Sequence, residues 1–106
     1  MSLPISIVIA DDHPMFAEGL ASLLQWHDHY RVVGYAYNGK EAVEKVAALR
    51  PDIAVIDINM PGMNGIEATQ QIRRQYPATR VIMLTMNDEA SVITQAVEAG
   101  AHAYLL

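Results

Sequence analysis

Residues 5–14 of this 106-residue chain read ISIVIADDHP, a mostly apolar run followed by two aspartates, a histidine and a proline. A short, β-branched run without polar alternation is typical of a strand that is buried on both faces, as in parallel sheets. Pro14 suits the first position of a helix, where its missing N–H is not needed. The stretch therefore predicts a strand over Ile5–Ala10 that leads, through Asp11–His13, directly into a helix.

The rest of the chain repeats this strand-to-helix order. Further strands are predicted over Arg31–Tyr37, Ile53–Asp57, Arg80–Met86 and Ala101–Leu106. The helices between the strands are predicted over residues 14–27, 39–49, 66–76 and 88–99. Helical spacing predicts that the first helix buries a stripe formed by Phe16, Leu20, Leu23, Leu24 and His27. Because the strands are too apolar to face water, the pattern predicts one α/β domain, a parallel sheet with helices on both faces.

Composition narrows the classes of function. The chain has 7 Lys and Arg against 12 Asp and Glu, a formal charge of −5, so it lacks the clustered positive charge that nucleic-acid binding needs. Without cysteine it can form neither disulfides nor thiolate zinc sites. No apolar run approaches 18 residues, so we predict no membrane span and expect a cytoplasmic protein.

Three aspartates lie at the carboxyl ends of predicted strands. Asp11 and Asp12 follow the first strand, Asp57 ends the third, and Thr85 lies near the end of the fourth. Ligands of open parallel sheets bind beyond the carboxyl ends of the strands, so neighbouring first and third strands would bring three carboxylates together. Two such charges about 4 Å apart repel by roughly 4 kcal/mol at an effective dielectric of 20. A raised pKa or a bound cation would relieve this, and an all-oxygen site favours Mg²⁺.

Beside a bound metal ion, the Asp57 carboxylate has the chemistry of a phosphoryl acceptor. Carboxylates form covalent aspartyl-phosphates, and a metal ion offsets charge on the transferring group. Asn59 can turn its backbone carbonyl toward the metal, and the Thr85 hydroxyl can donate to a phosphate oxygen. Alone, Asp12 would be interpreted as a helix cap, and we interpret His13 as a helix-start residue rather than a proton carrier.

Four motifs carry a family resemblance over all 106 residues. They are Asp11-Asp12, the stretch DINMPGMNG over residues 57–65, Thr85 and Tyr104. With these, the chain resembles the receiver domain of two-component response regulators. The resemblance implies a flavodoxin-like, doubly wound sheet of five parallel strands in the order 2-1-3-4-5.

The resemblance also implies roles for individual residues. Asp57 would be the phosphoacceptor, modified by a sensor histidine kinase. Asp12, Asp57 and the Asn59 carbonyl would bind Mg²⁺ directly, and Asp11 would act mainly through water. Thr85 and Tyr104 would be the switch residues that respond to phosphorylation, so the chain would be a conformational switch and not an enzyme.

The stretch DDHPMFAEGL over residues 11–20 resembles the NarL/FixJ subgroup. Its members usually carry a LuxR-type DNA-binding domain after the receiver, so DNA would be bound only through a domain outside this chain. We expect the natural domain to continue beyond Leu106 with the family's lysine and its last helix. A homodimer is left open.

Two rival functions remain at this point. One is a magnesium-dependent phosphatase with an aspartyl nucleophile. Such enzymes favour a second acid two residues after the nucleophile, where this chain has Asn59. The other is a pseudo-receiver, a binding module without phosphotransfer, against which the presence of Asp12, Asp57 and Thr85 argues.

Overall fold

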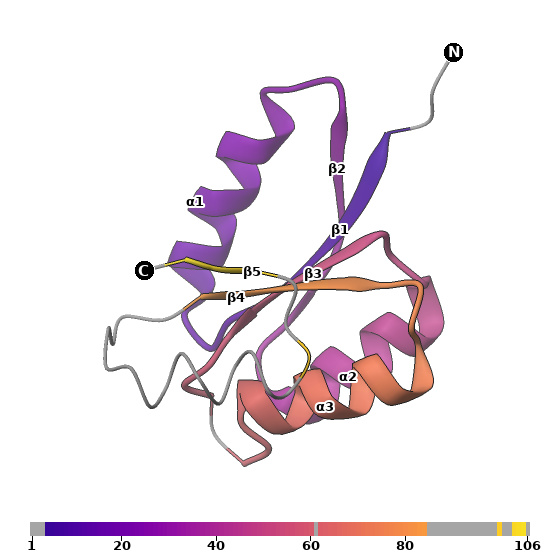
Figure 1. Cartoon of the computed structure of the whole chain (residues 1–106). Helices are drawn as coiled ribbons and strands as arrows, with labels where there is room; N and C mark the ends of the chain where they lie inside the picture. The colour runs from indigo at the N-terminus through magenta and orange to yellow at the C-terminus, as the bar shows by residue number, and fades with distance from the viewer. Residues whose placement is uncertain (1–3, 61, 85–99, 101–102, 106) are drawn as a thin grey trace.

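The computed structural model describes residues 4–60, 62–84, 100 and 103–105 (Figure 1). The strands are β1 (Ile5–Ala10), β2 (Tyr30–Ala36), β3 (Ile53–Asp57), β4 (Arg80–Leu84) and β5 (Ala103–Leu105). The helices are α1 (Pro14–Gln25), α2 (Gly39–Leu49) and α3 (Gly65–Gln75). All of these elements lie within two residues of their predicted bounds. The helix predicted over residues 88–99 lies outside the described residues.

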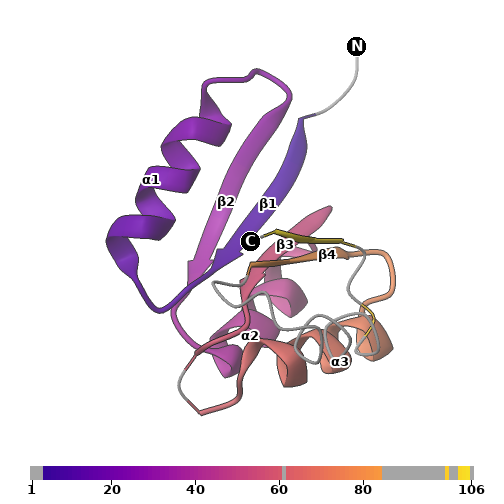
Figure 2. The same ribbon diagram turned by 60° about the vertical axis from the view of Figure 1, so that its left-hand side comes forward.

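The five strands form one parallel sheet in the order β2-β1-β3-β4-β5, as the resemblance implied. Helix α1 packs on one face, and α2 and α3 pack side by side on the other (Figures 1 and 2). Along β3, Ala54 and Ile56 belong to the core beneath α2 and α3, whereas Val55 belongs to the core beneath α1. The prediction of strands buried on both faces is therefore confirmed.

Helix α1 buries a different stripe from the predicted one. Phe16 is 52% exposed, Leu23 is 69% exposed and His27 is also exposed, so the prediction was wrong for these three side chains. The small side chains of Ala17 and Ala21 let the helix lie close to the sheet. Leu23 lies beside this buried stripe and is exposed to solvent. The side chains that face the sheet are Ala17, Leu20, Ala21 and Leu24.

The described residues do not fully cover the face of the sheet on which α1 packs. An apolar pocket of about 200 Å³ remains between α1 and the sheet. Its lining residues are Ile7, Leu20, Leu24, Tyr30, Ile53, Val55, Ile82 and Leu84. No helix in the described part of the chain is both long enough and apolar enough to cross a membrane.

The segment after β3 is tied to the sheet and to the start of α3. Ile58 donates its backbone N–H to the Leu84 carbonyl at 3.0 Å, and the Gly65 N–H donates to the Ile58 carbonyl at 3.0 Å. Asn64 caps α3 by accepting the Glu67 N–H at 2.9 Å, and the Glu67 carboxylate in turn accepts the Asn64 N–H. This capping box fixes where the helix begins, a few residues after Asp57.

Replacing Asn64 with alanine should therefore lower the free energy of unfolding by about 1 kcal/mol, because the Glu67 N–H loses its partner. Urea unfolding followed by circular dichroism would measure the change. Gln70→Ala, on the exposed face of α3, is the control and should change stability by less than about 0.5 kcal/mol. Equal effects of the two substitutions would contradict the capping role.

Candidate functional site

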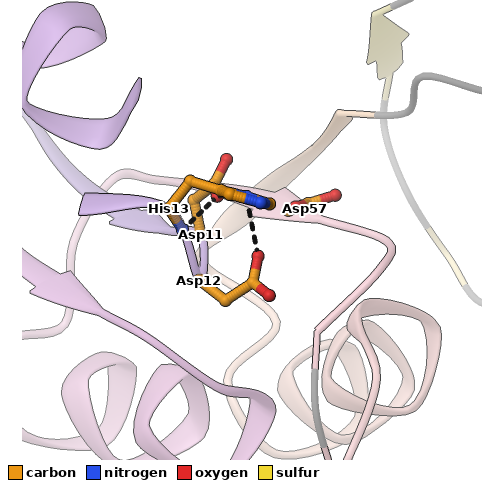
Figure 3. A group of neighbouring side chains, drawn as sticks. All are labelled: Asp11, Asp12, His13 and Asp57. Atoms are coloured by element: carbon orange, nitrogen blue, oxygen red, sulfur yellow. Dashed lines mark hydrogen bonds and ion pairs between the residues drawn. The ribbon is translucent and has the colours of Figure 1, made fainter. Parts of the chain in front are cut away.

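Four titratable side chains gather at the carboxyl ends of β1 and β3 (Figure 3). Asp11, Asp12 and His13 follow β1 directly, and Asp57 is the last residue of β3. Because Ala10 pairs with Ile56 across the two strands, the backbone brings the aspartates next to one another. Each of the four residues offers one ligand atom, and these atoms lie within 4.8 Å of one another. The structure thus brings together the three carboxylates that the sequence predicts to converge.

Asp11 is the buried member of the group, with 3% of its surface exposed. Its backbone N–H donates to the Ala36 carbonyl at 2.9 Å, which extends the pairing of β1 with β2 by one residue. Its Oδ1 accepts the backbone N–H of His13 at 2.8 Å and lies 3.1 Å from His13 Nδ1. The carboxylate is therefore held in one orientation from both the backbone and the imidazole ring.

Asp12 has an unsatisfied oxygen. Its Oδ1 is buried and accepts no hydrogen bond from the described residues. His13 Nδ1 lies 2.9 Å away and forms an ion pair when the ring is protonated, but the contact lacks hydrogen-bond geometry. A buried carboxylate oxygen without a donor costs free energy, which a cation at this position would recover.

Asp57 is half-buried, and its Oδ1 accepts the backbone N–H of Asn59 at 3.1 Å. Burial is the main cause that raises the pKa of Asp57 above its ordinary value of 3.8. The negative charges of Asp11 and Asp12 raise this pKa further, while the Asn59 N–H opposes the shift. In the metal-free state the site therefore disfavours a third negative charge.

The His13 side chain is 72% exposed and lies over the aspartates. The hydrogen bond with Asp11, followed by the charge of Asp12, raises the pKa of His13 above 6.5. His13 is also the N-cap residue of α1, so its interpretation as a helix-start residue is confirmed. The contact of its ring with the two carboxylates was not predicted, because it depends on the orientation of the His13 side chain.

The side chains fit a hard divalent cation. Three carboxylates within reach of one another, one oxygen without a donor and the raised pKa of Asp57 all indicate a site that is electrostatically incomplete without positive charge. Oxygen ligands in a small site suit Mg²⁺. The role of the Asn59 carbonyl stays a prediction, since only its N–H has a contact with Asp57.

The other residues singled out from the sequence are not among these four. Thr85 lies outside the described residues; Tyr104 is in β5, where its backbone pairs with Met83, and its side chain is likewise not described. His27 is exposed and packs its ring edge-on against Tyr30, with the centroids 6.0 Å apart. Met60 and Met83 are buried in the core.

Comparison with known families decides the identity. Residues 7–106 match the family model of the response regulator receiver domain. The chain belongs to the response regulator receiver domain family. Receiver domains are switch domains that generally bind Mg²⁺ at an acidic pocket, and the aspartate cluster of this chain lies where such a pocket would be.

Relatives of this receiver domain are transcriptional regulators. The transcriptional regulatory protein LnrK of Bacillus subtilis (strain 168) is 46% identical over 102 residues, which cover 96% of this chain and 46% of LnrK. The chain thus spans about half the length of this curated relative.

Solved receiver structures have the same fold. The signal receiver domain of the putative response regulator NarL from Mycobacterium tuberculosis superposes with a TM-score of 0.95 at 36% identity, covering 99% of this chain and 85% of that one. RcsB from Salmonella enterica serovar Typhimurium, bound to promoter rprA with phosphomimetic BeF₃⁻, has a TM-score of 0.88 at 25% identity, covering 98% and 60%.

Proposed function

We propose that this receiver domain accepts a phosphoryl group on Asp57 from a sensor histidine kinase and thereby switches a DNA-binding output domain. The observation that carries the proposal is the convergence of Asp11, Asp12 and Asp57 at one edge of the sheet, with ligand atoms within 4.8 Å. A structural cap or turn needs one aspartate, and no structural role of the described residues requires three at this place.

Asp11, Asp12, Asp57 and the backbone carbonyl of Asn59 would hold Mg²⁺, with Asp11 acting mainly through water. When bound, the ion neutralises negative charge on the transferring phosphoryl group and on the carboxylates around it. The Asp11 carboxylate has a fixed orientation, because the backbone N–H of His13 donates to its Oδ1 at 2.8 Å. Asp12 contributes an oxygen that lacks a donor within the described residues.

The reaction follows from the environment of Asp57. Its Oδ1 accepts the Asn59 N–H, and no described residue donates to Oδ2, so that oxygen is available to attack phosphorus. In the transfer an Asp57 oxygen–phosphorus bond forms and the nitrogen–phosphorus bond of the kinase phosphohistidine breaks. The electron pair of the broken bond returns to the imidazole nitrogen of the kinase.

The response would reach Thr85 and Tyr104. Asp57 pairs with Leu84, the residue before Thr85, so a group added to Asp57 lies next to the β4 backbone that leads to Thr85. Thr85 would donate to a phosphoryl oxygen, and Tyr104 would change position as a consequence. This is a shift between two populations, driven by contacts that the phosphoryl group makes better in the active state.

Intact-mass analysis after incubation with a small phosphodonor tests the proposal. We expect one added phosphoryl group per wild-type chain with Mg²⁺, little without Mg²⁺, and none in Asp57→Asn. Asp28→Asn, a change of an exposed acid in the loop after α1, is the matched control and should be labelled like the wild type.

Three outcomes would overturn the proposal. Labelling of Asp57→Asn equal to that of the wild type would place the acceptor elsewhere. Repeated turnover of a phosphoester without a lasting adduct would instead identify a phosphatase. A wild-type chain that binds Mg²⁺ but takes up no phosphoryl group would favour the pseudo-receiver.

A further inference from the structure

One ring nitrogen lies against two of the aspartates. His13 Nδ1 is 3.1 Å from Asp11 Oδ1 and 2.9 Å from Asp12 Oδ1 (Figure 3). These carboxylates come from successive residues and point toward the same nitrogen. Their oxygens are also among the ligand atoms that lie within 4.8 Å of one another at the cation site.

A cation and the ring compete for this space. Mg²⁺ binds carboxylate oxygens at about 2.0–2.1 Å and demands near-ideal octahedral geometry. An ion that binds Asp12 Oδ1 directly, and Asp11 Oδ1 through one of its water ligands, needs the approach that Nδ1 occupies. As a compact, strongly hydrated ion, Mg²⁺ also gains little from an imidazole ligand, which suits transition metals better. The ring must therefore leave before both aspartates can serve Mg²⁺.

The ring is free to leave without disturbing the fold. The His13 side chain is 72% exposed, and within the described part of the chain its ring forms hydrogen bonds or ion pairs only with the two aspartates. The structural contacts of His13 come from its backbone. Its N–H donates to Asp11 Oδ1 at 2.8 Å, and its carbonyl accepts the Ala17 N–H at 3.0 Å in the first turn of α1. Rotation of the ring leaves both bonds intact.

We propose that the His13 side chain is a displaceable occupant of the cation site, one that competes with Mg²⁺ and sets the Mg²⁺ affinity of this receiver domain. The inference rests on the cation site of the proposed function. His13 acts through Asp11 and Asp12 and is a positioning residue, not a catalytic one. In the metal-free protein the ring partly offsets the negative charge of the Asp11 and Asp12 carboxylates. In the metal-bound protein the ring points to solvent.

Calorimetric titration of Mg²⁺ into the whole 106-residue chain at one fixed, near-neutral pH tests the competition. His13→Ala removes the ring and should lower the dissociation constant about tenfold, which corresponds to about 1.4 kcal/mol. His13→Gln retains an N–H donor of similar reach, so its affinity should fall between those of the wild type and His13→Ala. His29→Ala removes an exposed histidine outside the site and should leave the affinity unchanged.

A second readout uses the wild type alone and does not depend on how well a variant folds. On saturation with Mg²⁺, the ring nitrogen resonances of His13 in ¹⁵N NMR should shift, while those of His29 stay in place. An unchanged His13 ring overturns the proposal.

Two further calorimetric results also overturn it. Unchanged affinity in His13→Ala means that the ring does not compete, and weaker affinity means that the ring serves as a ligand. Failure of the proposed function is seen in a different measurement, because then Asp57 takes up no phosphoryl group, whatever the Mg²⁺ affinities of the wild type and His13→Ala.

Discussion

Replacing Gly65 with alanine is expected to lower the free energy of unfolding by about 3 kcal/mol or more. Gly65 opens α3 directly against the chain that follows β3. A Cβ there would overlap the Asp57 carbonyl oxygen and lie 2.8 Å from both the Asp57 carbonyl carbon and the Ile58 Cα. These are backbone atoms, so no rotamer change relieves the overlap; α3 or the Asp57 backbone must move. Urea unfolding followed by circular dichroism measures the loss.

Gly19→Ala is the matched control. Gly19 lies within α1, and an added Cβ would have no neighbour within 4 Å. Because alanine is the better helix former, this substitution should raise stability by about 1 kcal/mol. Any Gly65→Ala chain that still folds should be labelled poorly at Asp57, since its backbone has shifted. A Gly65→Ala protein as stable as Gly19→Ala would contradict the close packing of α3 on β3.

Mg²⁺ should stabilise the wild-type domain strongly and the site variants weakly. At about 100 times its dissociation constant, a ligand that binds only the folded state adds about 2.7 kcal/mol, or roughly 10–20 °C in Tm for a domain of this size. Asp12→Asn and Asp57→Asn each remove a charged ligand and should lose most of that shift. Thermal unfolding with and without Mg²⁺ measures it, with Asp28→Asn as the control that keeps the wild-type response.

In the presence of Mg²⁺ the wild type should be more stable than Asp57→Asn, and without Mg²⁺ this order should reverse. The raised pKa of Asp57 means that its ionised form is disfavoured in the folded metal-free protein. The stability that its protonation contributes is fully present below the ordinary pKa of 3.8 and is lost as pH rises through the higher folded pKa. At neutral pH, Asp57→Asn should therefore be more stable than the metal-free wild type, on the order of 1 kcal/mol, because a neutral amide avoids the burial of a charge and the repulsion by Asp11 and Asp12.

The pH dependence of this difference is the check. The advantage of metal-free Asp57→Asn over the wild type should shrink as pH falls toward 3.8. A Tm shift by Mg²⁺ that is as large in Asp57→Asn as in the wild type would show that the ion binds elsewhere.

The order of the strands along the chain and the strand-end positions of the key carboxylates could be predicted from the amino-acid sequence. Runs such as Ile5–Ala10 and Ile53–Asp57 have too few polar residues for any exposed element, so their burial and strand type follow from composition and length. Aspartates directly after such runs must lie at the carboxyl edge of a parallel sheet. With the strand order that the family resemblance implies, which makes the first and third strands neighbours, Asp11, Asp12 and Asp57 could be predicted to meet before any contact was known.

Which face of α1 turns inward, and which atoms complete the site, depend on how the folded chain packs. Helical periodicity allowed a stripe through Phe16 and Leu23, but close approach to the sheet selected the stripe with Ala17 and Ala21. The contact of the His13 ring with two carboxylates depends on side-chain orientation, which spacing does not encode. The requirement for glycine at position 65 likewise arises from how closely two backbones pass. These features depend on distances between elements, which the chain acquires only when its core packs.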